Sequence, residues 1–168
     1  MMIRRATRED AATISGIHVR GWRWGYRGLL PGAFLDRLSI HERELSWRQQ
    51  LAPDHLTHTW IAEADGQVLG FVTCGPTGDA ELPQGTGQLY ALYQEESAAG
   101  TGVGRALLSH AISELRARGF EIAVLWVLEN NARARRFYEI AGWIPDGASK
   151  EDHRSDQVLP EVRYRRDL

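Results

Sequence analysis

The stretch 88–108 constrains this chain most, because it joins a strand-like run to a glycine-rich turn and the start of a helix: QLYALYQEESAAGTGVGRALL. The turn holds three glycines within five residues, Gly100, Gly102 and Gly104. Glycine removes the β-carbons where a ligand could otherwise contact the backbone. The first amides of the following helix lack intrahelical partners, and the helix dipole adds partial positive charge. The stretch therefore predicts a site for an anion such as a phosphate or pyrophosphate.

Two common phosphate-binding loops do not fit this turn. A Walker loop needs a Gly-Lys pair, and the chain contains none. A dinucleotide-binding fingerprint that starts at Gly100 would need glycine at position 105, where the chain has Arg105. An x-x-Gly-x-Gly turn around Gly102-Val103-Gly104 remains. Taken alone, it is equally compatible with an ordinary tight connection.

A second informative stretch follows the helix. Residues 121–127 (EIAVLWV) form an apolar, β-rich run typical of a buried strand. Residues 129–143 (ENNARARRFYEIAGW) then predict a helix that Asn131 caps and Gly142 ends. Without other information, this helix would be read as an amphipathic helix that places its aromatic pair in the core.

Both stretches occur in the same order as two segments of the GNAT superfamily of N-acetyltransferases. The first resembles the x-x-G-x-G turn of that superfamily, and the second resembles its N-x-x-A-x-x-x-Y-E-x-x-G-F/W segment. The resemblance spans nearly the whole chain. It implies an enzyme that transfers the acetyl group of acetyl-CoA to an amine of a small molecule or protein, by direct attack in a ternary complex.

The resemblance also implies which residues would bind acetyl-CoA. They are the turn, the strand before it and the asparagine cap: Leu92, Tyr93, Gly100, Thr101, Gly102, Val103, Gly104, Arg105 and Asn131. One of Arg133, Arg135 and Arg136 would approach the 3′-phosphate, unless all three are simply solvated. The Leu92 amide would polarise the thioester carbonyl. Tyr138 would protonate the departing thiolate, and the alternative is a tyrosine that only packs.

The acceptor side is implied by a third segment. Residues 22–31 (WRWGYRGLLP) resemble a W-x-x-x-Y-x-G-x-L-P segment of many family members, which places Trp22 and Tyr26 beside the acceptor. Packing of these aromatic residues at a helix–helix elbow is the alternative, and both can hold. Gln88 occupies the position where several relatives carry a glutamate general base.

Gln88 leaves the base undetermined, because glutamine can hydrogen-bond a water but cannot take up a proton. Glu95 or Glu96, a water chain, a residue from the acceptor side or an amine that enters neutral would have to serve instead. The missing base also motivates an alternative function, a non-catalytic acyl-CoA-binding sensor with the same fold.

The predicted element order is β-α-α-β-β-β-α-β-α-β-β. It resembles the GNAT layout in the α/β (α+β) class, with helices on both faces of a mixed central sheet of about seven strands, of which the fourth and fifth splay apart. A single helix is expected from Pro31 to Pro53, and a hairpin turn is expected at Asp65-Gly66. A further turn is expected at Asp146-Gly147, followed by an exposed polar stretch over 148–157. The whole chain, 1–168, is predicted to form one domain.

Composition narrows the class of protein further. A net charge of −2 gives no reason to expect binding to nucleic acid or membranes, and no signal peptide or long apolar run is evident, so a cytoplasmic protein is expected. The single cysteine, Cys74, cannot form an internal disulfide and reads as a structural thiol. The histidines lack ligand spacing, so no metal site is expected. A homodimer is compatible with the resemblance, but no stretch demonstrates one.

Overall fold

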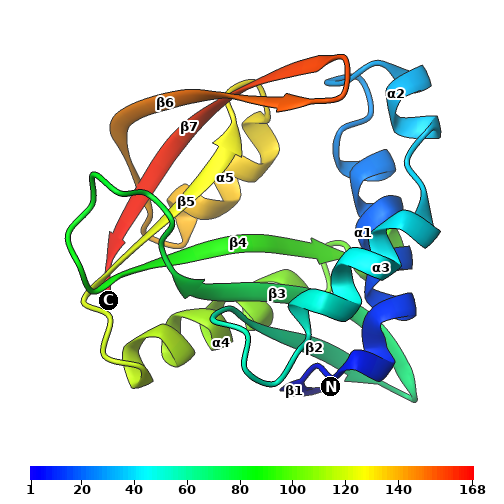
Figure 1. The fold of residues 1–168 in the computed structure, drawn as a ribbon, viewed down its shortest axis with the longest axis horizontal. Helices are drawn as coiled ribbons and strands as arrows, with labels where there is room; N and C mark the ends of the chain where they lie inside the picture. The colour runs from blue at the N-terminus through cyan, green and yellow to red at the C-terminus, as the bar shows by residue number, and fades with distance from the viewer.

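The computed structural model describes residues 1–168 and contains one mixed sheet of seven strands in the order β1-β2-β3-β4-β5-β7-β6 (Figure 1). The strands are β1 (Met2–Arg5), β2 (His58–Ala64), β3 (Gln67–Pro76), β4 (Thr86–Gln94), β5 (Ile122–Leu128), β6 (Ile144–Arg154) and β7 (Gln157–Asp167). Neighbouring strands are antiparallel except for β4 and β5, which are parallel. This architecture confirms the predicted fold class.

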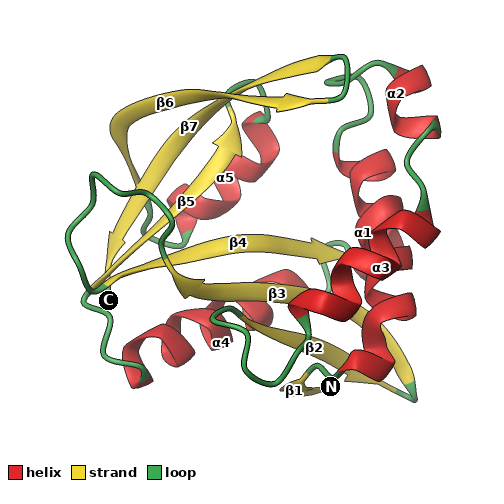
Figure 2. Cartoon of the chain, viewed as in Figure 1, coloured by secondary structure: helices red, strands yellow, loops and turns green.

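The chain has five α-helices (Figure 2). They are α1 (Ala11–Gly25), α2 (Gly32–Asp36), α3 (Ile40–Gln50), α4 (Val103–Ala117) and α5 (Ala132–Ile140). Apolar residues of α1 and α3 pack on one face of β2 and β3, where Ile17, Trp47 and Phe71 belong to one buried cluster. Residues of α4, such as Leu107, belong to a larger cluster on the other face, and α5 packs against it. No helix is long and apolar enough to cross a membrane.

Local sequence signals explain several boundaries. Asp65 and Gly66 both have positive φ (51° and 73°), as a two-residue hairpin turn between β2 and β3 requires. The segment predicted as one helix after Pro31 is instead two helices, α2 and α3. The chain is extended at Ser39, whose Oγ accepts the Glu42 N–H at 3.2 Å and so caps a new helix. This cap is the physical reason for the break.

The region 148–157 is mostly exposed, as predicted, but it forms part of a β-hairpin. Most of it belongs to β6, and the hairpin turn to β7 lies at 155–156. Residues Asp146-Gly147, predicted as a turn, lie within a register shift of the β6–β7 ladder, and Gly147 has φ 90°. Because β6 is an edge strand that pairs only with β7, its polar side chains can stay in water while its backbone is paired.

Strands β4 and β5 separate as they leave their paired region (Figure 1). Their pairing runs only from Thr86 with Ile122 to Leu89 with Leu125. At that point β4 also has a bulge, because Leu89 pairs with Cys74 and Ala91 pairs with Thr73, which leaves Tyr90 without a counterpart on β3. Beyond Leu89, the edge of β4 toward β5 has no strand neighbour. The predicted splay is therefore present.

Candidate active site

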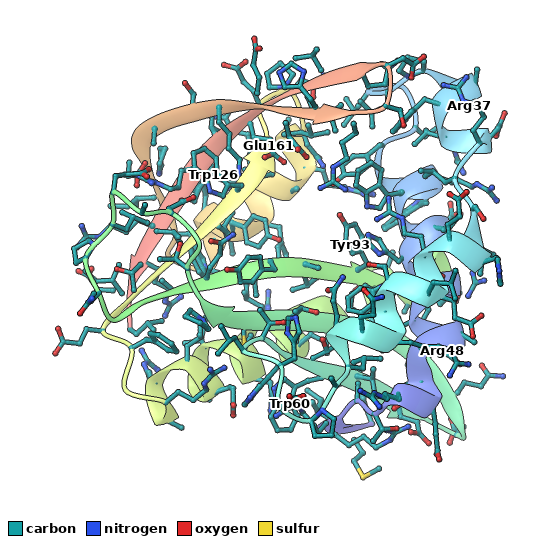
Figure 3. The ribbon with its side chains drawn as sticks, viewed as in Figure 1. Arg37, Arg48, Trp60, Tyr93, Trp126 and Glu161 are labelled. Atoms are coloured by element: carbon teal, nitrogen blue, oxygen red, sulfur yellow. The ribbon has the colours of Figure 1, made fainter.

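A cleft of about 380 Å³ lies where β4 and β5 separate, and we call it the central cleft. Residues of α1, β4, β5, α5, β6 and β7 line it, and Figure 3 shows side chains extending into this space from several elements. The predicted site residues among its lining are Trp22, Tyr26, Leu92, Tyr93, Gly100, Gly104, Asn131 and Tyr138. The structure thus brings together residues from both stretches that the sequence singled out and from the aromatic segment before them.

The glycine turn leads from β4 into the 15-residue helix α4. Gly100 and Gly102 have φ of 77° and 94°, a conformation that strains any L side chain. The N–H groups of residues 102–105 donate to no backbone carbonyl, since the first such bond of the helix runs from Ala106 N–H to the Gly102 carbonyl. A row of free amides at a helix N-terminus is a suitable cradle for a phosphate.

Gln94 adds a polar group beside this turn. Its Oε1 is buried without a hydrogen-bond partner, and it lies 2.9 Å from where a Cβ on Gly104 would be. A larger residue at position 104 would therefore require the Gln94 side chain to move. The open turn and the free amides together fit the phosphate end of a coenzyme A thioester, and the Gln94 oxygen remains free to accept a hydrogen bond from a donor of the ligand.

The remaining residues of the predicted turn do not line the central cleft. Val103 is buried in the core with 3% of its surface exposed, and the Thr101 hydroxyl donates to the Ala98 carbonyl at 2.7 Å. Arg105 lines a separate depression, together with Ser109 and Arg116. These side chains therefore shape the turn or its outer surface, while the backbone amides remain available.

Helix α5 begins as predicted. The Asn131 Oδ1 accepts the Ala134 N–H at 3.1 Å, and the residue is buried with 7% exposure. Among the three arginines, Arg135 donates to the Tyr164 hydroxyl at 3.0 Å and to the Glu129 carbonyl at 2.8 Å. Arg133 lines the cleft and stands 3.9 Å from the ring centroid of Trp24, so this guanidinium joins α5 to α1.

Three tyrosines meet in the cleft. The Tyr26 and Tyr93 hydroxyl oxygens are 3.2 Å apart, and burial raises the pKa of each above its ordinary value. Burial, and to a lesser extent the nearby Tyr93, also raises the pKa of Tyr138. All three phenols are therefore protonated at neutral pH. Tyr138 forms no hydrogen bond within the protein, so its proton is available to a bound group.

Leu92 lies on the part of β4 that has left β5. It pairs with Val72 of β3 on one side only. From Tyr90 to Gln94, backbone groups of β4 that are directed toward β5 have no strand partner, so an extended ligand arm could bind them as a strand would.

The aromatic segment at the end of α1 packs at a helix elbow and also lines the cleft. Trp22 is buried, and its ring meets the Tyr26 ring edge-on at 4.8 Å. Arg43 and Arg154 stand over Trp22 at 5.3 and 5.4 Å. Gln88 lies elsewhere: its side chain is outside the lining of the cleft, and its Oε1 accepts the Thr77 hydroxyl at 2.9 Å.

Sequence reasoning missed the contribution of the β6–β7 hairpin. Asp152, Arg154 and Glu161 all line the central cleft. The available signal was the run 157–166, whose alternation places Leu159, Glu161 and Arg163 on one face of β7. Cys74, by contrast, is buried in the core, where burial raises the pKa of its thiol to about 12, as expected for a structural thiol.

Comparison with known proteins identifies the class that this fold and cleft define. The model of the acetyltransferase (GNAT) family matches residues 20–143. A probable N-acetyltransferase of Mycobacterium tuberculosis is 32% identical over 97% of this chain and 91% of its own length. An uncharacterized N-acetyltransferase of Bacillus subtilis, YuaI, is 34% identical over 77% of this chain and 72% of its own length. The protein therefore belongs to the GNAT acetyltransferases.

Solved structures agree with this family. The PaiA N-acetyltransferase from Thermoplasma acidophilum, crystallised in complex with coenzyme A, superposes with a TM-score of 0.78 at 19% identity. The match covers 99% of this chain and 98% of that protein. At this level of identity the similarity confirms the fold, and the family model and curated relatives confirm the predicted family and the class of acyltransferase.

Proposed function

We propose that residues 1–168 act as a single domain that transfers the acetyl group of acetyl-CoA to an amine. The observation that carries this proposal is the set of free amides at residues 102–105, placed where β4 leaves β5 and opens the central cleft. A pyrophosphate at these amides puts the thioester arm beside the unpaired edge of β4. The coenzyme A bound by the PaiA relative supports the same choice of ligand.

The binding residues divide by the part of the ligand they would hold. The turn 100–105 binds pyrophosphate through its backbone, and Arg105 adds charge at its outer surface. Leu92 and Tyr93 offer backbone groups to the pantetheine arm, and Asn131 closes the cleft at the start of α5. Of the arginines, Arg133 is better placed than Arg135, which is already held by Tyr164 and Glu129.

Two groups would act on the reacting atoms. The Leu92 amide is a candidate donor to the thioester carbonyl, whose oxygen gains negative charge as the amine attacks. Tyr138 is a protonated phenol with no partner in the protein, and it can donate its proton to the sulfur that leaves. The raised pKa of Tyr138 keeps this acid protonated across the physiological range.

The acceptor would enter on the side formed by Trp22 and Tyr26. Their rings and residues of the β6–β7 hairpin line the same cleft as Gly100 and Gly104 of the glycine turn. Gln88 does not contact the acceptor in this arrangement. Its hydrogen bond with Thr77 instead stabilises the start of the loop between β3 and β4. Aromatic faces suit an amine with an apolar stem or a positive charge.

A thiol-release assay tests this function. The purified protein is mixed with acetyl-CoA and a panel of alkylamines, amino acids and peptides, and free coenzyme A is measured over time. Release that depends on one or more amines, with the acetylated amine identified by mass spectrometry, is the expected result. Tight binding of acetyl-CoA without release for any amine would instead favour a non-catalytic sensor of acyl-CoA.

A further inference from the structure

We infer that Glu161 is the general base of this transferase and that the acceptor is a positively charged alkylamine whose ammonium group docks on that carboxylate. This inference rests on the proposed acetyl transfer and deepens it. It answers the question that Gln88 raises, namely which group removes a proton from the attacking nitrogen.

The lining of the central cleft leaves few groups that can take up a proton. No histidine, lysine or cysteine lines it, and its carboxylates are those of Asp152 and Glu161. The Asp152 Oδ2 already accepts the Arg154 Nε–H at 2.7 Å. Glu161 forms an ion pair with Lys150, but the Lys150 Nζ is 3.8 Å from the Glu161 Oε2, beyond ordinary hydrogen-bond distance. Of the two, Glu161 is the carboxylate free to meet a ligand.

The other acids near the glycine turn are poorer candidates. Neither Glu95 nor Glu96 lines the cleft. The Glu95 carboxylate is held by Arg20 through Nε at 3.1 Å and through a second, shorter contact. The Glu96 side chain is 60% exposed at the surface, with Arg27 3.9 Å away. Geometry therefore excludes two of the bases that the sequence left open.

The position of Glu161 suits proton abstraction. It lies on β7, level with Leu128 of β5 and Lys150 of β6, and its side chain is 17% exposed. Figure 3 shows Glu161 and Tyr93 on opposite sides of the cleft. The apolar neighbours Leu128 and Leu159 are both buried, so the carboxylate lies in surroundings where an ammonium partner would be held strongly.

Electrostatics support this position. Burial raises the pKa of Glu161 above its ordinary value, and Asp152 raises it further, while Lys150 and Arg154 act in the opposite direction. Tyr26, at the end of α1, is the other titratable group that faces it, and its phenol is neutral. A carboxylate with a raised pKa is a stronger base than a solvated one, which brings it closer to the pH at which it must work.

The proton balance of the reaction closes with these groups. The Glu161 carboxylate accepts one proton from the acceptor ammonium, and the nitrogen lone pair then forms the C–N bond to the thioester carbon. As the C–S bond breaks, the sulfur takes the proton of Tyr138, and the phenolate regains one from the nitrogen, directly or through water. Glu161 releases its proton to solvent, so the products are the acetylated amine, free coenzyme A and one proton.

The test is the pH dependence of kcat/KM for Glu161→Gln with an amine found active in the thiol-release panel. At pH 7 the kcat/KM of the variant should be about 10²–10⁴-fold lower than that of the unmodified protein, which is the range that a positioned base contributes. Its activity should then rise about tenfold per pH unit up to the pKa of the amine, because only the neutral amine can react. In the unmodified protein, kcat/KM should not change with pH over the same range. It should fall only at lower pH, where Glu161 becomes protonated.

Two variants and one binding measurement complete the design. The control variant is Glu151→Gln, which removes a carboxylate that is 67% exposed on the neighbouring strand. Its kcat/KM and pH profile should match those of the unmodified protein. Glu161→Asp keeps a carboxylate and should retain the flat profile at a lower rate. Coenzyme A titration checks that Glu161→Gln is folded. A Glu161→Gln profile with the shape of the unmodified protein, whether at the same or a lower rate, would overturn the base role alone. Absence of thiol release by the unmodified protein would overturn the proposed function as well.

Discussion

The Tyr26 hydroxyl at the end of α1 and the Tyr93 hydroxyl on β4 form a hydrogen bond of 3.2 Å inside the central cleft. This bond ties the proposed acceptor side of the cleft to β4, the strand that carries the predicted cofactor contacts. Tyr93 also stacks on His18 of α1, with ring centroids 4.8 Å apart. The floor of the cleft is therefore held by a small network of aromatic side chains.

Removing the Tyr26 hydroxyl should weaken this network. Tyr26→Phe is expected to lower the free energy of unfolding by about 1 kcal/mol, because the buried Tyr93 hydroxyl loses its partner. Urea denaturation of Tyr26→Phe, Tyr93→Phe and the double variant measures the coupling between the two groups. Effects that simply add would show that the two hydroxyls do not stabilise one another.

Tyr138→Phe tests the proposed acid. We expect kcat to fall by about 10²-fold, the lower end for a positioned acid, because a thiolate is already a good leaving group. Coenzyme A affinity should not change, since the ring still packs against the same core. In the unmodified protein, the raised pKa of Tyr138 should place the alkaline loss of activity above the ordinary range of tyrosine. An unchanged kcat in Tyr138→Phe would show that Tyr138 does not act as the acid and serves only in packing.

Asn131→Ala should affect stability through the cap of α5. Loss of the bond from Ala134 N–H is expected to lower the free energy of unfolding by about 1 kcal/mol. Asn131→Ser, which can still accept that bond, serves as the matched control. Its free energy of unfolding should be close to that of the unmodified protein. Equal stability of the alanine and serine variants would argue against the cap.

His18 should make the protein less stable in mild acid. Burial, reinforced by Arg43 and Arg154, lowers the pKa of His18 to about 3 from an ordinary value of 6.5. Below pH 6.5, His18 becomes protonated in the unfolded chain but stays neutral in the folded protein. The free energy of unfolding therefore falls as the pH falls. The slope contributed by His18 is at most about 1.4 kcal/mol per pH unit.

His18→Asn isolates this contribution. The asparagine Oδ1 can replace the His18 Nδ1 that accepts the Trp47 indole N–H at 3.2 Å. Denaturation midpoints between pH 5 and 7.5 should therefore depend less on pH in the variant than in the unmodified protein. Identical pH dependence in the two proteins would mean that His18 ionises normally in the folded state.

The features that sequence alone predicted are those set by local patterns. The unit from β4 through the glycine turn to α4 is carried by consecutive residues, and the positive φ of Gly100 and Gly102 fits the residues found there. The Asn131 cap and the Asp65-Gly66 turn are local for the same reason. Such signals need no knowledge of distant contacts.

The features that sequence missed depend on contacts between distant segments. The alternation of β7 indicates which residues share a face with Glu161, but its place in the cleft depends on the register of β7 with β5 and β6. The choice between Arg133 and Arg135 follows from Trp24 and Tyr164, which lie far away in the chain. The break at Ser39 was a local signal, since serine is a common helix cap, but the apolar pattern across it favoured one helix.

The most direct test of the coenzyme A site is calorimetric titration of the unmodified protein, Gly102→Asp and Gly66→Asp with coenzyme A. Both variants put the same side chain at a glycine of positive φ with open space around it, but Gly66 lies in the distant β2–β3 turn. Gly102→Asp adds negative charge to the proposed phosphate cradle and should weaken binding by at least about tenfold, or 1.4 kcal/mol, relative to Gly66→Asp. Equal affinity in the two variants, or no binding by the unmodified protein, would contradict a coenzyme A site at this turn.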